Sequence, residues 1–255
     1  MEPDRPYEPV SAKDLGALMT SDAFAELDIR KHMELMQEYR AAIREITTKF
    51  EILDEDARLR MQHNPIHGIT SRLKSPTSLI EKLRRKGLPL TTESIRVNVH
   101  DVAGVRVVCN YLDDVDTVAT ALLKQDDIGL IERKDYVASP KESGYRSLHL
   151  VVSVPVFLND TRREIPVEVQ IRTIAMDFWA SLEHRLRYKN RAVLEANGPQ
   201  VEDIRARLVS CAHQIADLDR AMQQIQRDID ALRVEQEETF IRSLEMRTEG
   251  LALDA

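Results

Sequence analysis

The stretch that decides the fold is Val167-Glu168-Val169-Gln170-Ile171-Arg172-Thr173. Its side chains alternate between apolar and polar, which is the period of a β-strand. Glu168, Gln170 and Arg172 therefore share one face of the expected sheet, and the three apolar side chains share the other. From the alternation alone, a β-hairpin with a solvated polar face remains an open alternative to a functional site.

A polar loop upstream of this strand favours the functional interpretation. It reads Lys141-Glu142-Ser143-Gly144-Tyr145-Arg146-Ser147-Leu148-His149 and leads into an apolar stretch that is typical of a strand. The loop carries one aromatic ring, which can stack on a base, between cationic side chains. Together with an acid, an amide and a cation on the neighbouring strand, it indicates a nucleotide site.

Hydrophobic periodicity predicts an α+β or α/β fold, with helices packed on a mixed β-sheet, and we expect the α+β class. An apolar stripe from Met36 to Ala57 predicts a helix over about 24–61, and Asn64-Pro65 ends it. Further helices are expected over 75–86, 115–124 and 174–188, the last anchored by Phe178, Trp179 and Leu182, and from Gly198-Pro199 to about Phe240. Strands are expected over 105–111, 131–136, 148–157 and 167–172.

Composition excludes several classes of protein. The net charge of the 255 residues is −7, which argues against a general nucleic-acid binder, so no DNA partner is expected. No stretch has the roughly 20 apolar residues that span a bilayer, and the N-terminus lacks a signal-peptide pattern. We therefore expect a cytoplasmic protein without a membrane partner, in which Cys109 and Cys211 are buried free thiols.

One segment of this acidic chain is basic and suits a compact polyphosphate. Residues 72–86 contain six lysines and arginines and one acid, Glu81. A solvated helix face is the alternative. Because none of the glycine-rich phosphate-binding motifs occurs, side-chain cations and Mg²⁺ would have to hold the phosphates of a bound nucleotide.

The motifs K-E-S-G-Y-R-S-L-H, E-V-Q-I-R-T and A-M-D-F-W-A-S-L-E-H, with R-L-K and D-V-A-G-V-R upstream, resemble the synthetase domain of the RelA/SpoT family. The similarity runs from about Pro65 to Asn190 and is strongest to the short, single-domain small alarmone synthetases. It implies a nucleotidyltransferase-like fold with long terminal helices. The implied activity is transfer of the β,γ-pyrophosphate of ATP to the 3′-hydroxyl of GDP or GTP, which gives AMP and ppGpp or pppGpp.

The resemblance also implies roles for individual residues. Asp101 and Glu168 match the pair that binds Mg²⁺, and Glu168 also matches the residue that orients or deprotonates the 3′-hydroxyl. Six cations match or are candidates for ATP contacts: Arg72, Lys74, Lys82, Arg85, Arg106 and Arg133. Five residues are assigned to GDP or GTP: Lys141, Tyr145, His149, Gln170 and Asp177. Ser143 departs from the longer relatives, which have Asn before the Gly-Tyr pair.

Three other functions are alternatives to pyrophosphate transfer to GDP or GTP. His100-Asp101 resembles the HD motif of a hydrolase domain, but that domain needs further ligands over a large helical region, so we expect synthesis without hydrolysis. A toxin-like relative would act on adenine nucleotides or on the tRNA end, and the absence of a basic C-terminal tail disfavours the tRNA version. A nucleotide sensor without turnover is disfavoured by the presence of both Asp101 and Glu168.

The expected domain order is an N-terminal arm over 1–22, the synthetase domain over 23–198, an oligomerisation helix over 199–240 and a tail over 241–255. An apolar seam at steps of four and three follows the long helix: Ile204, Leu208, Cys211, Ile215, Leu218, Met222, Ile225, Ile229 and Leu232. The seam must be buried, either against the 36–57 stripe or against another subunit. The resemblance implies a homotetramer, with a regulatory alarmone in its central cleft.

Overall fold

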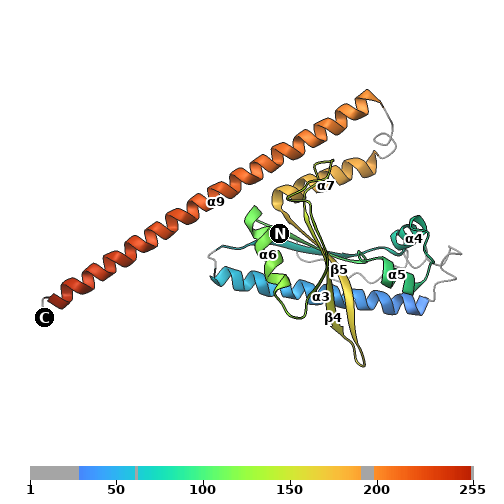
Figure 1. Ribbon diagram of the computed structural model, residues 1–255, viewed down its shortest axis with the longest axis horizontal. Coiled ribbons are helices and arrows are strands. Elements are labelled where there is room, and N and C mark those ends of the chain that lie inside the picture. The colour runs from blue at the N-terminus through green and yellow to red at the C-terminus, as the bar shows by residue number, and fades with distance from the viewer. Residues whose placement is uncertain (1–28, 61–62, 191–197, 254–255) are drawn as a thin grey trace.

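A computed structural model describes residues 29–60, 63–190 and 198–253 (Figure 1). The helices are α3 (Ile29–Arg60), α4 (Pro76–Arg85), α5 (Thr92–Asn98), α6 (Leu112–Leu123), α7 (Ile174–Lys189) and α9 (Pro199–Leu253). The strands are β1 (Ile66–Leu73), β2 (Ala103–Cys109), β3 (Gly129–Asp135), β4 (Leu148–Phe157) and β5 (Arg162–Thr173). The predicted arm over 1–22 lies outside the described residues.

The five strands form one mixed sheet in the order β1-β2-β5-β4-β3. Strands β2 and β5 run parallel, and each of the other neighbouring pairs is antiparallel. Strand β5 therefore lies at the centre, and its apolar side chains Val167, Val169 and Ile171 are fully buried. The predicted α+β class, a mixed sheet flanked by helices, is confirmed.

Helix α3 covers one face of the sheet and contributes one side of the main core (Figure 1). Leu35, Tyr39, Ala42, Ile46 and Phe50 are fully buried, at steps of three and four that put them on one side of the helix. They pack against the apolar face of the sheet. The opposite face of the sheet keeps its polar side chains.

Two elements were not predicted from the sequence. Strand β1 is an edge strand in which only Ile66 is buried, and it pairs with β2 through backbone hydrogen bonds rather than through an apolar pattern. Helix α5 is short and begins at Thr91, whose hydroxyl accepts from the backbone N–H of Ser94. The predicted tail over 241–255 is wrong for residues 241–253, because α9 continues to Leu253.

Helix α9 packs on the body through a face that carries no apolar stripe. Its buried residues near the body are Ala212, Ala216, Asp219 and Gln223. Most of the predicted seam lies on a neighbouring face, where Ile225 and Leu232 are more than half exposed, whereas Ile215 packs against the cluster around Trp179. The 36–57 stripe packs against the sheet, so the interpretation in which the two stripes pack against each other is wrong.

Three smaller expectations also need correction. Cys109 is buried, but Cys211 is exposed because it lies on the outer face of α9. Trp179 is a buried anchor of α7, as expected, whereas Phe178 and Leu182 are 58% and 44% exposed. Within the described ranges, no helix is long and apolar enough to cross a membrane.

Candidate functional site

The polar face of the sheet, opposite α3, brings together side chains from four strands. Directly paired residues on neighbouring strands project from the same face. Gln170 is paired with Arg106 on β2 and with His149 on β4, and His149 is paired with Lys134 on β3. Glu168 lies one step along β5 on the same face, so an acid, an amide, a histidine and two cations form one surface.

Asp101 lies two residues before β2, at the edge of this surface. Lys82 Nζ is 2.7 Å from Asp101 Oδ1, and Lys74 Nζ is 2.7 Å from Oδ2. Burial raises the pKa of Asp101, but hydrogen bonds from the two lysines outweigh it and hold the pKa below its usual value. The carboxylate is therefore charged at neutral pH and already surrounded by the cations that a phosphate would need.

Glu168 is held by two neighbours on the same face. His149 Nδ1 is 3.6 Å from Glu168 Oε1, and Gln170 Nε2 donates to Oε2 at 2.9 Å. The polar contact with His149 is the main cause of a lowered pKa at Glu168, against burial and the neighbouring charge of Asp101, which raise it. The influence of Asp101 on Glu168 indicates that the two carboxylates act in one electrostatic neighbourhood.

A first hollow on this face lies between β1, β2 and β5. Its volume is about 160 Å³, and its lining consists of Thr70, Ser71, Arg72, Gly104, Val105, Arg106, Glu168 and Gln170. Burial and the nearby Arg172 lower the pKa of Arg106. Two flat guanidinium groups in one hollow can hold a purine ring by stacking and also attract an anion.

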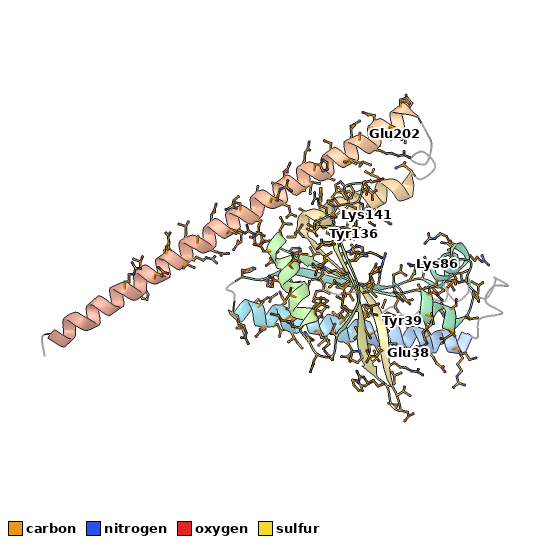
Figure 2. All side chains as sticks on the ribbon, viewed as in Figure 1. Glu38, Tyr39, Lys86, Tyr136, Lys141 and Glu202 are labelled. Atoms are coloured by element: carbon orange, nitrogen blue, oxygen red, sulfur yellow. The ribbon has the colours of Figure 1, made fainter. Side chains whose placement is uncertain are left out.

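The second hollow lies over β3 and β4 and has a volume of about 210 Å³. Its lining consists of Glu132, Lys134, Tyr136, Lys141, His149, Val151 and Glu168. Lys141 Nζ lies 4.5 Å from the centre of the Tyr136 ring and 4.9 Å from that of Tyr145. Figure 2 shows Tyr136 and Lys141 together at the α7 end of the sheet. The hollow thus combines aromatic rings with mobile ammonium groups.

Of the residues that the structure describes, Glu168 alone lines both hollows. A ligand in the first hollow and a ligand in the second would therefore approach each other at this carboxylate. Such an arrangement suits a reaction between two bound molecules, with their reacting groups at Glu168.

The structure brings together most of the predicted site residues but separates two from the rest. Arg85 is exposed at the end of α4, one turn beyond Lys82. Arg133 pairs with the buried Leu150, so it lies on the α3 face, where it contacts Asp116 and Asp135. Its position does not support the expected ATP contact.

Sequence reasoning missed Lys134 and Tyr136, and it gave Arg172 no role. A register shift between Leu130 and Glu132 decides that Lys134, rather than Arg133, shares a face with His149. Tyr136 follows β3 directly, and an aromatic residue between a strand and a polar loop was the available signal.

Helix α9 packs against the loop that residues 141–147 form. Gly144 has φ +85, and a side chain there would overlap Ala212 of α9. Trp179 Nε1 donates to the carbonyl of Leu208, also on α9, at 3.3 Å. The glycine is therefore required by both its conformation and the close approach of α9, which fixes the loop beside the second hollow.

The comparisons with known proteins identify the family. Residues 71–193 match the family model described as a region found in RelA / SpoT proteins. The GTP pyrophosphokinase YwaC of Bacillus subtilis is 44% identical over 151 residues, which cover 59% of this chain and 72% of that relative. The chain belongs to the RelA/SpoT family. A second relative, the GTP pyrophosphokinase YjbM of the same species, is 34% identical and covers 80% of this chain and 92% of its own length.

Solved structures of this family agree with the fold. The small alarmone synthetase 1 of Bacillus subtilis, bound to its product pppGpp, aligns with a TM-score of 0.69 at 35% identity. The alignment covers 78% of this chain and 98% of that chain. A GTP pyrophosphokinase family protein from Streptococcus pneumoniae aligns with a TM-score of 0.68 at 36% identity, over 77% and 93% of the two chains.

The donor set fits Mg²⁺ that enters with a nucleotide. Mg²⁺ is commonly held by one or two carboxylates, with phosphates and waters completing its shell. Asp101 and Glu168 are charged at neutral pH and belong to one site. Among the described residues, no group of three or more acids, histidines or cysteines could hold a metal alone, so phosphate oxygens would have to complete the coordination.

The lowered pKa of Glu168 predicts a pH dependence of stability. A depressed folded-state pKa contributes stability that is present above the unfolded value of 4.5 and is lost as pH falls through the folded value. The free energy of unfolding of the wild type should therefore fall more steeply below about pH 5 than that of Glu168→Gln. Urea unfolding between pH 7 and pH 3 measures this free energy for both proteins. Glu51→Gln, at an exposed position of α3, is the control, and parallel curves for wild type and Glu168→Gln would contradict the assignment.

Proposed function

We propose that this protein transfers the β,γ-pyrophosphate of ATP to the 3′-hydroxyl of GDP or GTP, which yields AMP and ppGpp or pppGpp. The observation that carries the proposal is the pair of hollows that meet at Glu168. One hollow is lined by guanidinium groups and the other by aromatic rings and ammonium groups. Two nucleotides placed in them would have their reacting groups at the same carboxylate.

ATP is assigned to the first hollow. Arg72 and Arg106 hold the adenine, because planar guanidinium groups stack on rings. Lys74 and Lys82 bind the phosphates from their places beside Asp101. Asp101 and Glu168 would hold Mg²⁺, and the chemistry that the ion would supply is neutralisation of phosphate charge during transfer. Arg85 extends the basic surface one turn beyond Lys82.

The guanine nucleotide is assigned to the second hollow and its surrounding loop. Tyr145 stacks on guanine, an interaction worth roughly 1–3 kcal/mol. Lys141 and His149 bind the phosphates, and Gln170 and Asp177 accept hydrogen bonds from the guanine edge. An acidic acceptor favours guanine, since guanine presents N–H donors at N1 and N2 and adenine does not.

In the reaction the 3′-oxygen attacks the β-phosphorus of ATP and the bond between that phosphorus and the α,β-bridging oxygen breaks. AMP leaves with the bridging oxygen, and the proton of the hydroxyl passes to Glu168 or to water. The lowered pKa makes Glu168 a weak base. Its main contribution is therefore to orient the hydroxyl and to bind the metal, which lets positioning supply much of the rate.

The choice of acceptor and the presence of turnover distinguish two other functions from alarmone synthesis. A toxin-like pyrophosphokinase would modify adenine nucleotides or tRNA, and a sensor would bind nucleotides without turnover. Incubation with Mg²⁺, ATP labelled at the β-phosphate and each of GMP, GDP, GTP, adenine nucleotides and tRNA separates the three. The absence of hydrolase activity and the cytoplasmic location stay predictions.

Removal of either carboxylate should abolish transfer. We expect Asp101→Ala and Glu168→Ala to lose at least about a hundredfold in kcat, since metal organisation contributes several kcal/mol and each 1.36 kcal/mol is about tenfold. Product formation from labelled ATP measures the loss, and circular dichroism verifies folding. Glu51→Ala is the matched surface control. A folded variant with wild-type turnover would refute the catalytic assignment.

The seam on α9 supports a proposal on assembly. A second exposed apolar stripe follows α7, the helix packed beside α9: Ile174, Phe178, Leu182 and Leu186. Figure 1 shows α9 running beyond the body towards its C-terminal end. We propose that copies of the chain associate through this helix in a homotetramer, as the resemblance implies, and that a regulatory alarmone occupies a cleft between subunits.

Light scattering tests the assembly. The wild type should have the mass of a tetramer, and Ile225→Asp/Ile229→Asp should dissociate it because two charges would be buried in the interface. Gln224→Asp/Asp228→Asn, on a polar face of the same helix, is the control and should remain tetrameric. A monomeric wild type would eliminate the proposal, and a tetramer unaffected by the first pair would place the interface elsewhere.

A further inference from the structure

Arg172 is a buried cation on β5 that we assign to neither substrate. Only 4% of the residue is exposed. Its Nε donates to Ser147 Oγ at 3.3 Å, Nη1 to Asp177 Oδ1 at 3.2 Å, and Nη2 to Tyr145 OH at 2.6 Å and Gln170 Oε1 at 2.7 Å. Three of these four partners are the residues assigned to guanine.

The contact between Arg172 and Tyr145 orients the hydroxyl hydrogen of Tyr145 as well as its ring. Because Arg172 donates to the phenolic oxygen, the hydroxyl hydrogen is free to donate to His149 Nε2, which is 2.7 Å away. In a neutral imidazole this leaves the proton on Nδ1, the nitrogen that faces Glu168. The guanidinium also lies 5.1 Å from the centre of the Tyr145 ring. Arg172 therefore orders Tyr145 directly and His149 through it.

The contact with Asp177 orients that carboxylate. Nη1 of Arg172 and Nη1 of Arg106 each lie 3.2 Å from the same oxygen, Oδ1. Both arginines thus contact Oδ1, and neither contacts Oδ2, the oxygen that we assign to the guanine edge. An arginine fork can hold Tyr145, Gln170 and Asp177 at once because its donors lie in one rigid plane, and a lysine ammonium cannot reproduce that geometry.

We propose that Arg172 is a positioning residue that sets the Tyr145 ring and the Asp177 carboxylate for the purine of the acceptor, and so determines selectivity for guanine. The inference rests on the function proposed above and deepens it. Arg172 contacts three residues assigned to guanine directly, whereas it reaches the adenine-site Arg106 only through Asp177. Its loss should therefore affect the acceptor more than the donor.

Steady-state kinetics of Arg172→Lys tests the inference, with GTP, ITP and ATP varied in turn. ITP lacks the 2-amino group but keeps the N1 hydrogen. KM for GTP should rise roughly tenfold or more, as expected for lost hydrogen bonds of a charged group, and KM for ATP should rise by a clearly smaller factor. The ratio of kcat/KM for GTP over that for ITP should fall.

Tyr145→Phe provides a second test that keeps the ring and removes the oxygen. If Arg172 acts through Tyr145, the effects of Tyr145→Phe and Arg172→Lys on KM for GTP should be less than additive in the double variant. Should Arg172→Lys not fold, Tyr145→Phe alone must still raise KM for GTP without raising KM for ATP. Additive effects, or no effect of Tyr145→Phe, would overturn the proposed route.

Arg96→Lys is the matched control. Arg96 is a half-buried arginine on α5, and its Nη1 donates to Glu38 at 2.6 Å. Glu38 lies on α3, on the other side of the sheet from Tyr136 and Lys141 (Figure 2). This variant should lower thermal stability and leave the GTP-to-ITP ratio unchanged. Equal rises in both KM values for Arg172→Lys would overturn the inference alone, whereas a wild type inactive with every guanine nucleotide would overturn the proposed function as well.

Discussion

The alternation of side chains along β5 is the constraint on which the rest of the structure depends. Its apolar face is fully buried against α3, and its polar face carries Glu168, Gln170 and Arg172. A slip of one residue in register would expose the valines and bury the acid. The burial of apolar side chains that stabilises the core therefore also positions the site, because alternate residues of β5 belong to the core and to the site. The parallel pairing with β2 and the antiparallel pairing with β4 place a different hollow on each side of this strand.

Each acid of the site is held by two neighbouring polar or cationic side chains. Asp101 is bound by two lysines, Glu168 by His149 and Gln170, and Asp177 by two arginines. A buried charge is tolerated only when it is paired or hydrogen-bonded, so these contacts keep the polar face folded without a ligand. The lysines beside Asp101 are thereby held where incoming phosphates and Mg²⁺ would need them. Preorganisation of this kind reduces the reorganisation required during transfer.

The sequence predicted the elements with strong periodicity and failed where tertiary contact decides. Strand β4 matches its expected bounds, because it is rich in apolar residues and most of them are buried. Strand β1 was missed since its residues are mostly polar and its structure comes from pairing with β2. The face of α9 that packs on the body consists of alanine, aspartate and glutamine, which form no apolar pattern but permit close approach to Gly144. Most residues that the motifs matched, including both carboxylates, lie near one face of the sheet, but the register shift in β3 that separates Arg133 from Lys134 has no signal in one sequence.

The central claim is that two nucleotides bind at once and meet at Glu168. A crystal structure of the protein with GDP and an ATP analogue that has a methylene between the α- and β-phosphates tests it most directly, because that analogue cannot be cleaved at the reacting bond. The account predicts adenine between Arg72 and Arg106, guanine on Tyr145, and the 3′-oxygen about 3–3.5 Å from the β-phosphorus beside Glu168. Both purines competing for one hollow, or a 3′-hydroxyl remote from Glu168, would contradict it.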